Sequence, residues 1–313
     1  MAKSINISNN NISWNGDDVE YDDDYDGPGL DEIEVGSIGG TDGGLPQLMW
    51  LRKHQSMALK KPHHFVLVHG AGHGAWCWYK VETLLKSAGN QVTSLDLAAC
   101  GINPKQYYQV LSDSDLYEPL TKFMESLPVE EKVILVGHSY SGTGVAMIME
   151  SFPNKIAVAV FVTATMPGPA LSNAAIAEES SHGQPPRDDM DNVYKFNESG
   201  QPIAFRFGPE YLSAKMYHLC SPEDSTLASN LVRYVNVYQP DEPSLSDANY
   251  GSVRRAFVIS QEDKVWRREI QKWITEKNPP DMVKEIHGSD HMVMLSKPRE
   301  LSDSFMDIAE SFA

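Results

Sequence analysis

The sequence has 313 residues, 41% of them hydrophobic and 22% charged, which suits a globular protein large enough to bury a substantial core. Its net charge of −17 argues against nucleic acid as a partner, because an acidic surface repels a phosphate backbone. We find no secretory signal at the start, and no run approaches the roughly 20 apolar residues that cross a bilayer. These features predict a cytoplasmic protein that does not enter a membrane.

Residues 1–60 differ in composition from the rest of the chain. Residues 17–26 are mostly acidic, and glycine-rich runs follow them. Such a segment cannot bury enough apolar surface to offset the entropy of ordering. We therefore predict a disordered acidic extension over 1–60 and a folded domain over 61–313.

Short apolar runs alternate with amphipathic segments along the folded domain. Unbroken apolar strands between helices are typical of a mostly parallel sheet covered by helices on both faces, so the predicted fold class is α/β. The predicted strands cover residues 65–69, 91–97, 132–137, 155–164, 254–260 and 282–287. The predicted helices cover residues 78–88, 114–127, 142–152, 266–277 and 297–312.

Residues 166–250 interrupt this alternation. They contain scattered proline and glycine, with helical pieces near 209–219 and 223–233 and no comparable apolar strand. Insertions of this kind sit at the carboxyl edge of the sheet, where open α/β folds place their sites. We predict a helical cap over a pocket, inserted into a core formed by 61–165 and 251–313.

The cysteines and histidines give no indication of a metal centre. Cys77, Cys100 and Cys220 are odd in number and widely spaced, which predicts free thiols in a reducing compartment. The sequence has neither an HExxH motif nor a Cys/His cluster, so no metal is implied.

The strongest chemical motif is Gly137-His138-Ser139-Tyr140-Ser141-Gly142, directly after an apolar strand and directly before a helix. A nucleophile elbow places its serine on such a strained turn, with small residues around it because strand and helix approach closely. The fifth position of the usual G-x-S-x-G pattern is Ser141 here, which is small enough to be tolerated. The motif predicts Ser139 as a nucleophile.

An activated serine needs a base, and the base needs an orienting acid. In chain order after Ser139, Glu262-Asp263 lie in the turn after one predicted strand. The next strand ends in His287, and Asp290-His291 lie in the turn after it. Position alone leaves Asp263 competing with Glu262 and His291 competing with His287. The loop position of His291 favours it as the base.

The first predicted turn, His69-Gly70-Ala71-Gly72-His73-Gly74-Ala75, supports two interpretations. As part of a hydrolase site, its backbone would supply an oxyanion donor, the N–H of Ala71. The spacing Gly70-x-Gly72-x-x-Ala75 also fits a dinucleotide fingerprint, with Asp96 as the ribose ligand. The dinucleotide hypothesis does not explain the Ser139 elbow or the ordered acid and histidine turns, so we favour the hydrolase.

With these motifs in hand, the chain from His64 onward resembles the plant methylesterase and hydroxynitrile lyase family of α/β-hydrolases. The resemblance implies the α/β-hydrolase fold, His291 as base and Asp263 as acid. It also implies an oxyanion hole made by the backbone N–H groups of Ala71 and Tyr140. The blocks that carry it are HFVLVHGAGHGAWCWYK, VTSLDLAACGINP, EKVILVGHSYSG, LCSPED and GSDHMVMLSKP.

Within that family the sequence favours the esterase branch. Lyases of the family resemble one another in a threonine and a lysine at the positions that Gly70 and Met292 occupy here, and Met292 cannot supply their cation. The resemblance therefore implies hydrolysis of a small apolar ester, without a cofactor and with room for a homodimer. Family substrates suggest methyl esters of jasmonate, salicylate, indoleacetate or related alkaloids. Tyr140 and Ser141 leave a weakly active ligand-binding protein as the alternative.

Overall fold

The computed structural model describes residues 62–183, 188–237 and 242–313, all within the unit Lys60–Ala313. The predicted extension over residues 1–60 lies outside these described residues. Within the described part of the chain, we find no helix with the length and apolar character needed to span a bilayer.

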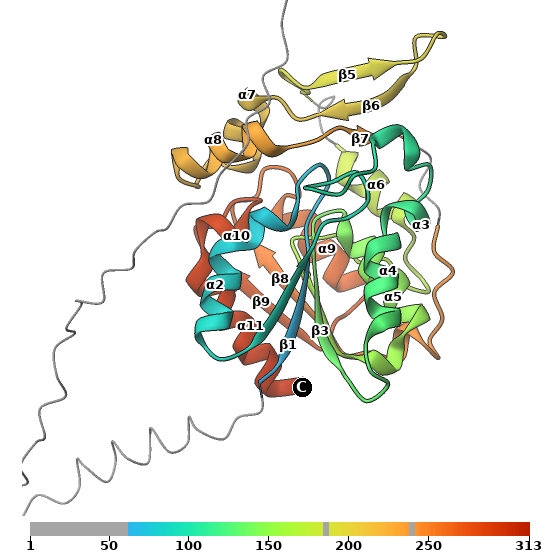
Figure 1. The fold of residues 1–313 in the computed structure, drawn as a ribbon, viewed down its shortest axis with the longest axis vertical. Helices are drawn as coiled ribbons and strands as arrows, with labels where there is room; N and C mark the ends of the chain where they lie inside the picture. Colours follow the sequence, from blue (N-terminus) through green and yellow to red (C-terminus); the bar gives the residue numbers. More distant parts are fainter. Residues whose placement is uncertain (1–61, 184–187, 238–241) are drawn as a thin grey trace, which may run out of the picture. The chain divides into compact units, whose positions relative to one another are not determined.

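Six parallel strands form one sheet in the order β2-β1-β3-β4-β8-β9 (Figure 1). Each strand corresponds to one of the six apolar runs in the sequence, so the predicted α/β sheet is confirmed. The strands are β1 (His64–Val68), β2 (Gln91–Leu95), β3 (Val133–His138), β4 (Ile156–Val162), β8 (Arg255–Ser260) and β9 (Met282–Ile286).

Successive side chains of β1 enter two separate cores, because strand residues point alternately to the two faces of a sheet. Phe65 and Leu67 pack with residues of α2 (Tyr79–Ser87) and α11 (Pro298–Phe312). Val66 and Val68 pack with residues of α4 (Glu118–Ser126), α5 (Ser141–Ser151) and α9 (Arg268–Lys277). Both faces of β1 are therefore buried, which explains why its sequence is an unbroken apolar run.

The helix predicted over 114–127 is two helices, α3 (Asp113–Leu116) and α4. Pro119 lies in the first turn of α4, and a proline there has no N–H to continue the hydrogen bonding of a preceding helix. Short segments complete the core: η1 (Ala75–Trp78), η2 (Tyr107–Gln109), η3 (Pro153–Lys155), η5 (Tyr250–Ser252) and α10 (Val293–Ser296).

The chain between β4 and β8 forms the cap over the carboxyl ends of the strands (Figure 1). The predicted helical pieces are present as α7 with η4 and as α8, and a further helix, α6, precedes them. In addition, the cap contains a three-stranded antiparallel sheet in the order β5-β6-β7, which the sequence did not predict. Its elements are α6 (Asn173–Ser181), β5 (Val193–Phe196), β6 (Pro202–Arg206), α7 (Pro209–Tyr211), the π-helical turn η4 (Leu212–Met216), α8 (Pro222–Leu231) and β7 (Val235–Asn236).

Buried polar side chains fasten the cap to the core. The Asn278 amide nitrogen donates to the carbonyl oxygens of Met166 and Pro167, at 3.1 and 3.3 Å, where the chain enters the cap. The same nitrogen lies 2.8 Å from the Tyr250 hydroxyl, where the chain leaves it. In the middle of the cap, the Asp224 carboxylate binds Lys80 at 2.6 Å. The two ends of the insertion are thus held by one side chain.

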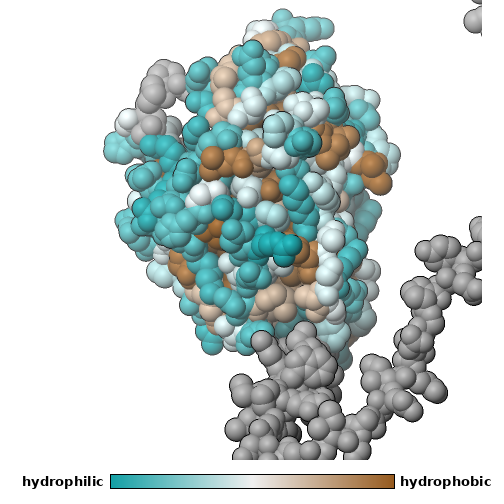
Figure 2. Space-filling view, turned by 90° about the vertical axis from the view of Figure 1, so that its left-hand side faces the viewer, coloured by the Kyte–Doolittle hydropathy of each residue, from teal (hydrophilic) through white to brown (hydrophobic). Residues whose placement is uncertain are grey.

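One described face of the molecule is mostly hydrophilic (Figure 2), and the cysteines are unpaired, as the composition of the chain predicts. On the face shown in Figure 2, the described residues are mostly hydrophilic, and apolar residues form scattered groups. Cys77, Cys100 and Cys220 are all free thiols, as the odd number and wide spacing of the cysteines predicted.

Candidate active site

Ser139 lies on the sharp turn between β3 and α5. Its φ of +57° is in the left-handed region, which costs a residue other than glycine about 1–3 kcal/mol and persists only where the surrounding structure enforces it. Here a Cβ on Gly142 would lie 1.7 Å from the Thr165 carbonyl oxygen, and one on Gly137 would lie 2.5 Å from Val145. The two glycines permit the close approach that holds Ser139 in this conformation.

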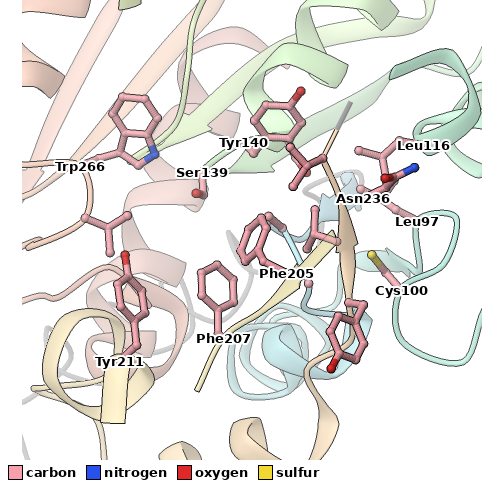
Figure 3. Close-up of a pocket in the computed structure, with 18 of the residues that line it drawn as sticks. Leu97, Cys100, Leu116, Ser139, Tyr140, Phe205, Phe207, Tyr211, Asn236 and Trp266 are labelled. Atoms are coloured by element: carbon pink, nitrogen blue, oxygen red, sulfur yellow. The ribbon is translucent and has the colours of Figure 1, made fainter. Parts of the chain in front are cut away.

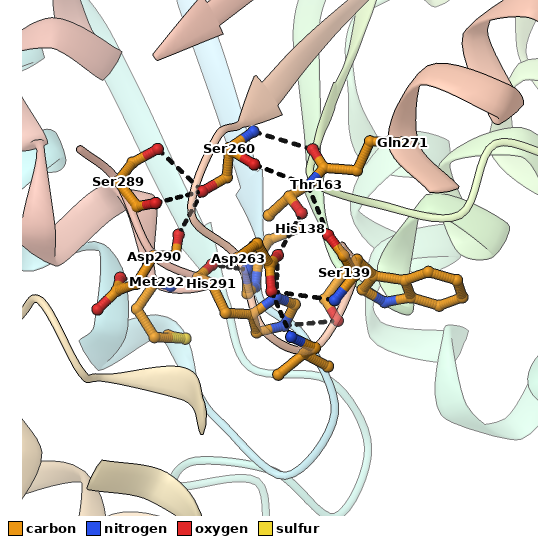
Figure 4. Close-up of polar contacts among 12 residues, drawn as sticks. His138, Ser139, Thr163, Ser260, Asp263, Gln271, Ser289, Asp290, His291 and Met292 are labelled. Atoms are coloured by element: carbon orange, nitrogen blue, oxygen red, sulfur yellow. Dashed lines mark hydrogen bonds and ion pairs between the residues drawn. The ribbon is translucent and has the colours of Figure 1, made fainter. Parts of the chain in front are cut away.

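Ser139, His291 and Asp263 lie in one hydrogen-bonded chain, although 152 residues separate the serine from the histidine (Figure 4). The His291 Nε2 atom is 3.0 Å from the Ser139 Oγ, and its Nδ1 is 2.7 Å from the Asp263 Oδ2. All three are buried, with exposed fractions of 8%, 1% and 4% for Ser139, His291 and Asp263. The arrangement has the geometry of a nucleophile, a base and an orienting acid.

The Asp263 carboxylate is fully engaged as an acceptor. Its Oδ1 accepts from the backbone N–H groups of Val265 and Trp266, at 2.6 and 3.0 Å. Its Oδ2 accepts from the Thr163 hydroxyl at 2.6 Å as well as facing His291. These four contacts hold the carboxylate in one orientation.

The competing acid and histidine lie elsewhere. Glu262 is exposed. The His287 Nδ1 is 2.7 Å from the Gln261 side chain, in an exposed contact. Of the residues that position alone left open, the structure places Asp263 and His291 in the hydrogen-bonded chain with Ser139.

A buried polar network joins the loops that carry the acid and the histidine (Figure 4). The Ser260 hydroxyl, at the end of β8, lies 2.9 Å from the Ser289 hydroxyl and donates to the Asp290 carbonyl at 2.6 Å. The Gln271 side chain accepts from the Ser260 backbone N–H and donates to the Ser260 carbonyl oxygen, each at 2.9 Å. The ends of β8 and β9 are therefore fixed relative to each other.

The first turn of the core brings Ala71 beside Ser139. A Cβ on Gly70 would lie 3.0 Å from the Ser139 Cβ, so only glycine packs there without displacing a neighbour. Ala71 and Tyr140 both line the pocket that contains Ser139. Tyr140 also immediately precedes α5, whose N-terminus favours negative charge. Both residues therefore border the same pocket as Ser139, and their backbone N–H groups remain the predicted oxyanion donors.

The two unusual residues of the elbow have partners that direct them away from the nucleophile. The Tyr140 hydroxyl donates to the Asp113 carboxylate at 2.9 Å, and its ring points away from Ser139 (Figure 3). The buried Ser141 hydroxyl donates to the His69 carbonyl. Neither side chain closes the approach to Ser139.

Ser139 opens into a pocket of about 800 Å³ between the core and the cap (Figure 3). Most of the walls are apolar or aromatic, and several of the aromatic rings come from the cap. The aromatic lining residues are Tyr107, Tyr140, Phe205, Phe207, Tyr211, Tyr234 and Trp266. Cys100 also lines the pocket, and burial raises the pKa of its thiol to about 12, so it stays protonated.

Three further histidines surround the site and are buried. Burial lowers the pKa of His69, lowers that of His73 to about 3, and lowers that of His138 far below the usual range. The His138 Nε2 donates to the His291 carbonyl at 2.8 Å. These neutral rings bind backbone groups and so orient the main chain around the site.

The residues proposed for a dinucleotide serve the fold instead. The Asp96 carboxylate accepts from the backbone N–H groups of Ala75 and Ile102, at 2.7 and 3.2 Å. It therefore ties together the two loops on either side of it. Among the described residues, no three His, Cys, Asp or Glu side chains gather as metal ligands would.

Comparison with known proteins agrees with this geometry. Residues 65–304 match the protein family described as the alpha/beta hydrolase family. The chain is 46% identical over 260 residues to methyl jasmonate esterase 1 of Vitis vinifera, covering 81% of this chain and 99% of that protein. It is 42% identical to polyneuridine aldehyde esterase of Rauvolfia serpentina, covering 82% and 100%. The structure of tomato methylketone synthase I with 2-tridecanone is also similar, with a TM-score of 0.74, 43% identity and coverage of 81% and 100%.

Proposed function

Because the chain belongs to the alpha/beta hydrolase family, we propose that it is a serine esterase that cleaves methyl esters of small, largely apolar carboxylic acids. The observation that carries the proposal is the hydrogen-bonded chain from Ser139 through His291 to Asp263 at a pocket with aromatic walls. The similarity to two plant esterases over nearly their whole length supports the same activity.

In the proposed acylation step, His291 removes the proton of the Ser139 hydroxyl as the oxygen attacks the ester carbonyl. The carbonyl oxygen becomes an oxyanion, which the backbone N–H groups of Ala71 and Tyr140 stabilise. His291 then gives its proton to the departing methoxide, so methanol leaves and the acyl group stays on Ser139. Asp263 holds the imidazole in the tautomer that this sequence requires and stabilises its protonated form.

Deacylation repeats these roles with water. His291 takes a proton from the water as it attacks the acyl-enzyme, and the same two N–H groups stabilise the second oxyanion. His291 returns the proton to Ser139, which releases the carboxylic acid and restores the free enzyme. No step requires a cofactor.

The pocket supports an apolar acyl group. Apolar and aromatic walls gain free energy by covering apolar surface, at roughly 25 cal/mol per Å². The candidate substrates are methyl esters of jasmonate, salicylate, indoleacetate and related alkaloids, in keeping with the names of the two plant esterases. The lyase alternative is weaker, because the Met292 side chain is fully buried and carries no charge.

The proposal is tested by labelling with a fluorophosphonate, followed by turnover of a methyl-ester panel. We expect the wild type to be labelled and Ser139→Ala to be unlabelled, with hydrolysis falling at least about 10⁴-fold in the variant. Release of methanol from at least one ester in the panel supports the proposal. Labelling without turnover of any ester, together with tight binding of a free acid, would instead favour a ligand-binding protein.

A further inference from the structure

The backbone around Ala71 is held by two imidazole rings. The His69 Nδ1 lies 2.7 Å from the Gly70 carbonyl oxygen, and the His73 Nδ1 lies 2.9 Å from the Ala71 carbonyl oxygen. A carbonyl oxygen only accepts, so both Nδ1 atoms must carry the hydrogen. The two peptide units on either side of the Ala71 Cα atom are therefore each fixed by an N–H donor.

The opposite nitrogens of the two rings have donors of their own. The His69 Nε2 accepts from the backbone N–H of Leu97 at 3.1 Å. The His73 Nε2 lies 2.8 Å from the Tyr217 hydroxyl and must accept from it, since its own hydrogen is on Nδ1. Both rings are buried and neutral, and burial raises the pKa of Tyr217 well above its usual value. Each ring thus has one tautomer that satisfies both nitrogens.

The two rings differ in where their outer donor comes from. The donor to His69 belongs to the core, whereas Tyr217 belongs to the cap and is 144 residues from His73 in sequence. The π-helical turn η4 places Tyr217, whose N–H bonds to the Leu212 carbonyl at 2.8 Å. The Tyr217 ring also stacks on His73, with centroids 6.0 Å apart and an angle of 11° between the planes.

The same segment of the cap also contacts the loop that carries His291, the proposed base. The Leu219 N–H donates to the Asp290 carboxylate at 2.8 Å, and Asp290 is the fully buried neighbour of His291. Residues 217–219 therefore contact both the turn 69–73, which contains Ala71, and the loop that contains Asp290 and His291. The position of this turn is set by contacts on both sides of the site.

We propose that Tyr217 and His73 are positioning residues for the oxyanion hole: the cap tyrosine fixes the orientation of His73, which fixes the backbone at Ala71. The inference rests on the proposed function, in which the Ala71 N–H stabilises the oxyanion. The cap would then have two roles: it forms a wall of the pocket, and its position relative to the core determines the geometry of the oxyanion hole.

The first test is Tyr217→Phe, which removes the hydroxyl and keeps the ring. We expect kcat for p-nitrophenyl acetate to fall about tenfold with little change in KM, less than the roughly 100- to 1,000-fold loss on deleting an oxyanion donor. The rate of fluorophosphonate labelling should fall by the same factor, because phosphonylation also places an oxygen in the oxyanion hole.

Tyr79→Phe is the matched control. The Tyr79 hydroxyl also links core to cap, donating to Asp224 at 2.9 Å, and within the described residues it makes no hydrogen bond to the turn 69–73. We expect a small loss of thermal stability in this variant and an unchanged kcat. Equal losses of kcat in both variants would mean that the hydroxyl of Tyr217 only stabilises the cap, and would overturn the proposal.

The second test compares His73→Asn with His73→Leu. Asparagine retains an N–H donor that can reach the Ala71 carbonyl, whereas leucine does not. We expect His73→Asn to keep several times more kcat than His73→Leu, and Tyr217→Phe to have no further effect in the His73→Asn background. Equal activity of the two His73 variants, or full additivity with Tyr217→Phe, would contradict the proposal.

These experiments separate the inference from the proposed function. If the wild type hydrolyses no methyl ester but is labelled by the fluorophosphonate, the proposed function fails, and the labelling rates of the variants still test the oxyanion hole. If methyl esters are hydrolysed and Tyr217→Phe labels at the wild-type rate, only the inference fails.

Discussion

The parallel-sheet core and the cap contribute to the same pocket in different ways. The core supplies Ser139, Asp263 and His291 from turns that follow its strands, and the three side chains are buried and hydrogen-bonded to one another. The cap supplies aromatic walls from short strands, and three of the four residues of β5 are exposed. The comparison suggests that rigid core turns determine the chemistry, while a less constrained insertion determines which molecule reaches it.

The largest effect is expected from a change in the core. In Asp263→Asn, the amide NH₂ must face a donor, because the carboxylate accepts from Thr163, His291 and two backbone N–H groups. The His291 ring then loses its required tautomer, and we expect kcat for p-nitrophenyl acetate to fall about 10⁴-fold.

The control for this variant is Glu262→Gln, which neutralises the exposed neighbouring carboxylate and should leave kcat within about twofold. A larger loss from Glu262→Gln than from Asp263→Asn would mean that the acid has been assigned to the wrong residue.

The second prediction concerns the pH dependence of core stability. His69, His73 and His138 are buried and neutral, so between pH 6.5 and the lower pKa of the folded state only the unfolded chain binds their protons. The free energy of unfolding should therefore decrease as pH falls below about 6.5, by roughly 1.4 kcal/mol per pH unit for each histidine. Urea denaturation at pH 7.5, 6 and 5 measures this slope.

Removing one of these rings sharpens the test. His73→Asn should lower the slope of the unfolding free energy against pH by roughly 1.4 kcal/mol per pH unit, the contribution of one proton. His182→Asn, at an exposed position, should leave this slope unchanged. A free energy of unfolding that stays constant from pH 7.5 to pH 5 would show that these rings take up protons without unfolding the core.

The smallest expected effect is on the cap side. Phe205 lines the pocket from β6, so Phe205→Ala removes a wall and should raise KM for an apolar methyl ester about tenfold. The kcat and the fluorophosphonate labelling rate should stay within about twofold, because Ser139 and His291 keep their contacts.

Phe196→Ala is the matched control, since Phe196 is exposed on the adjacent strand β5 and does not line the pocket. If Phe205→Ala lowers kcat as strongly as it raises KM, the cap wall and the catalytic geometry are not separable at this position.

The sequence predicted the core well for a physical reason. Strands buried on both faces need unbroken apolar runs, so all six were recognisable, and the turns that follow them hold Ser139, Asp263 and His291. Ser139 was identifiable because a strained strand-to-helix turn needs small neighbours, which Gly137 and Gly142 provide. The choice of Asp263 over Glu262 required the resemblance, because adjacent residues at one strand end look alike in sequence.

The cap sheet was missed because its strands carry no such pattern. Strand β5 has the sequence Val193-Tyr194-Lys195-Phe196 and is largely exposed, so no apolar alternation marks it. A usable signal was the turn Asn197-Glu198-Ser199-Gly200, where the Asn197 side chain accepts two backbone N–H bonds and Gly200 has a φ of +76°. The partnership of His73 with Tyr217 has no local signature, since it joins residues 144 positions apart.

The double attachment at Asn278 has a consequence for how this protein can diversify. The cap leaves the core beside Met166 and returns beside Tyr250, and the same amide nitrogen holds both points. We therefore expect an exchange of the intervening segment to preserve the fold only if its successor keeps these two attachments. It must also replace the contacts that the present cap makes with Lys80, His73 and Asp290.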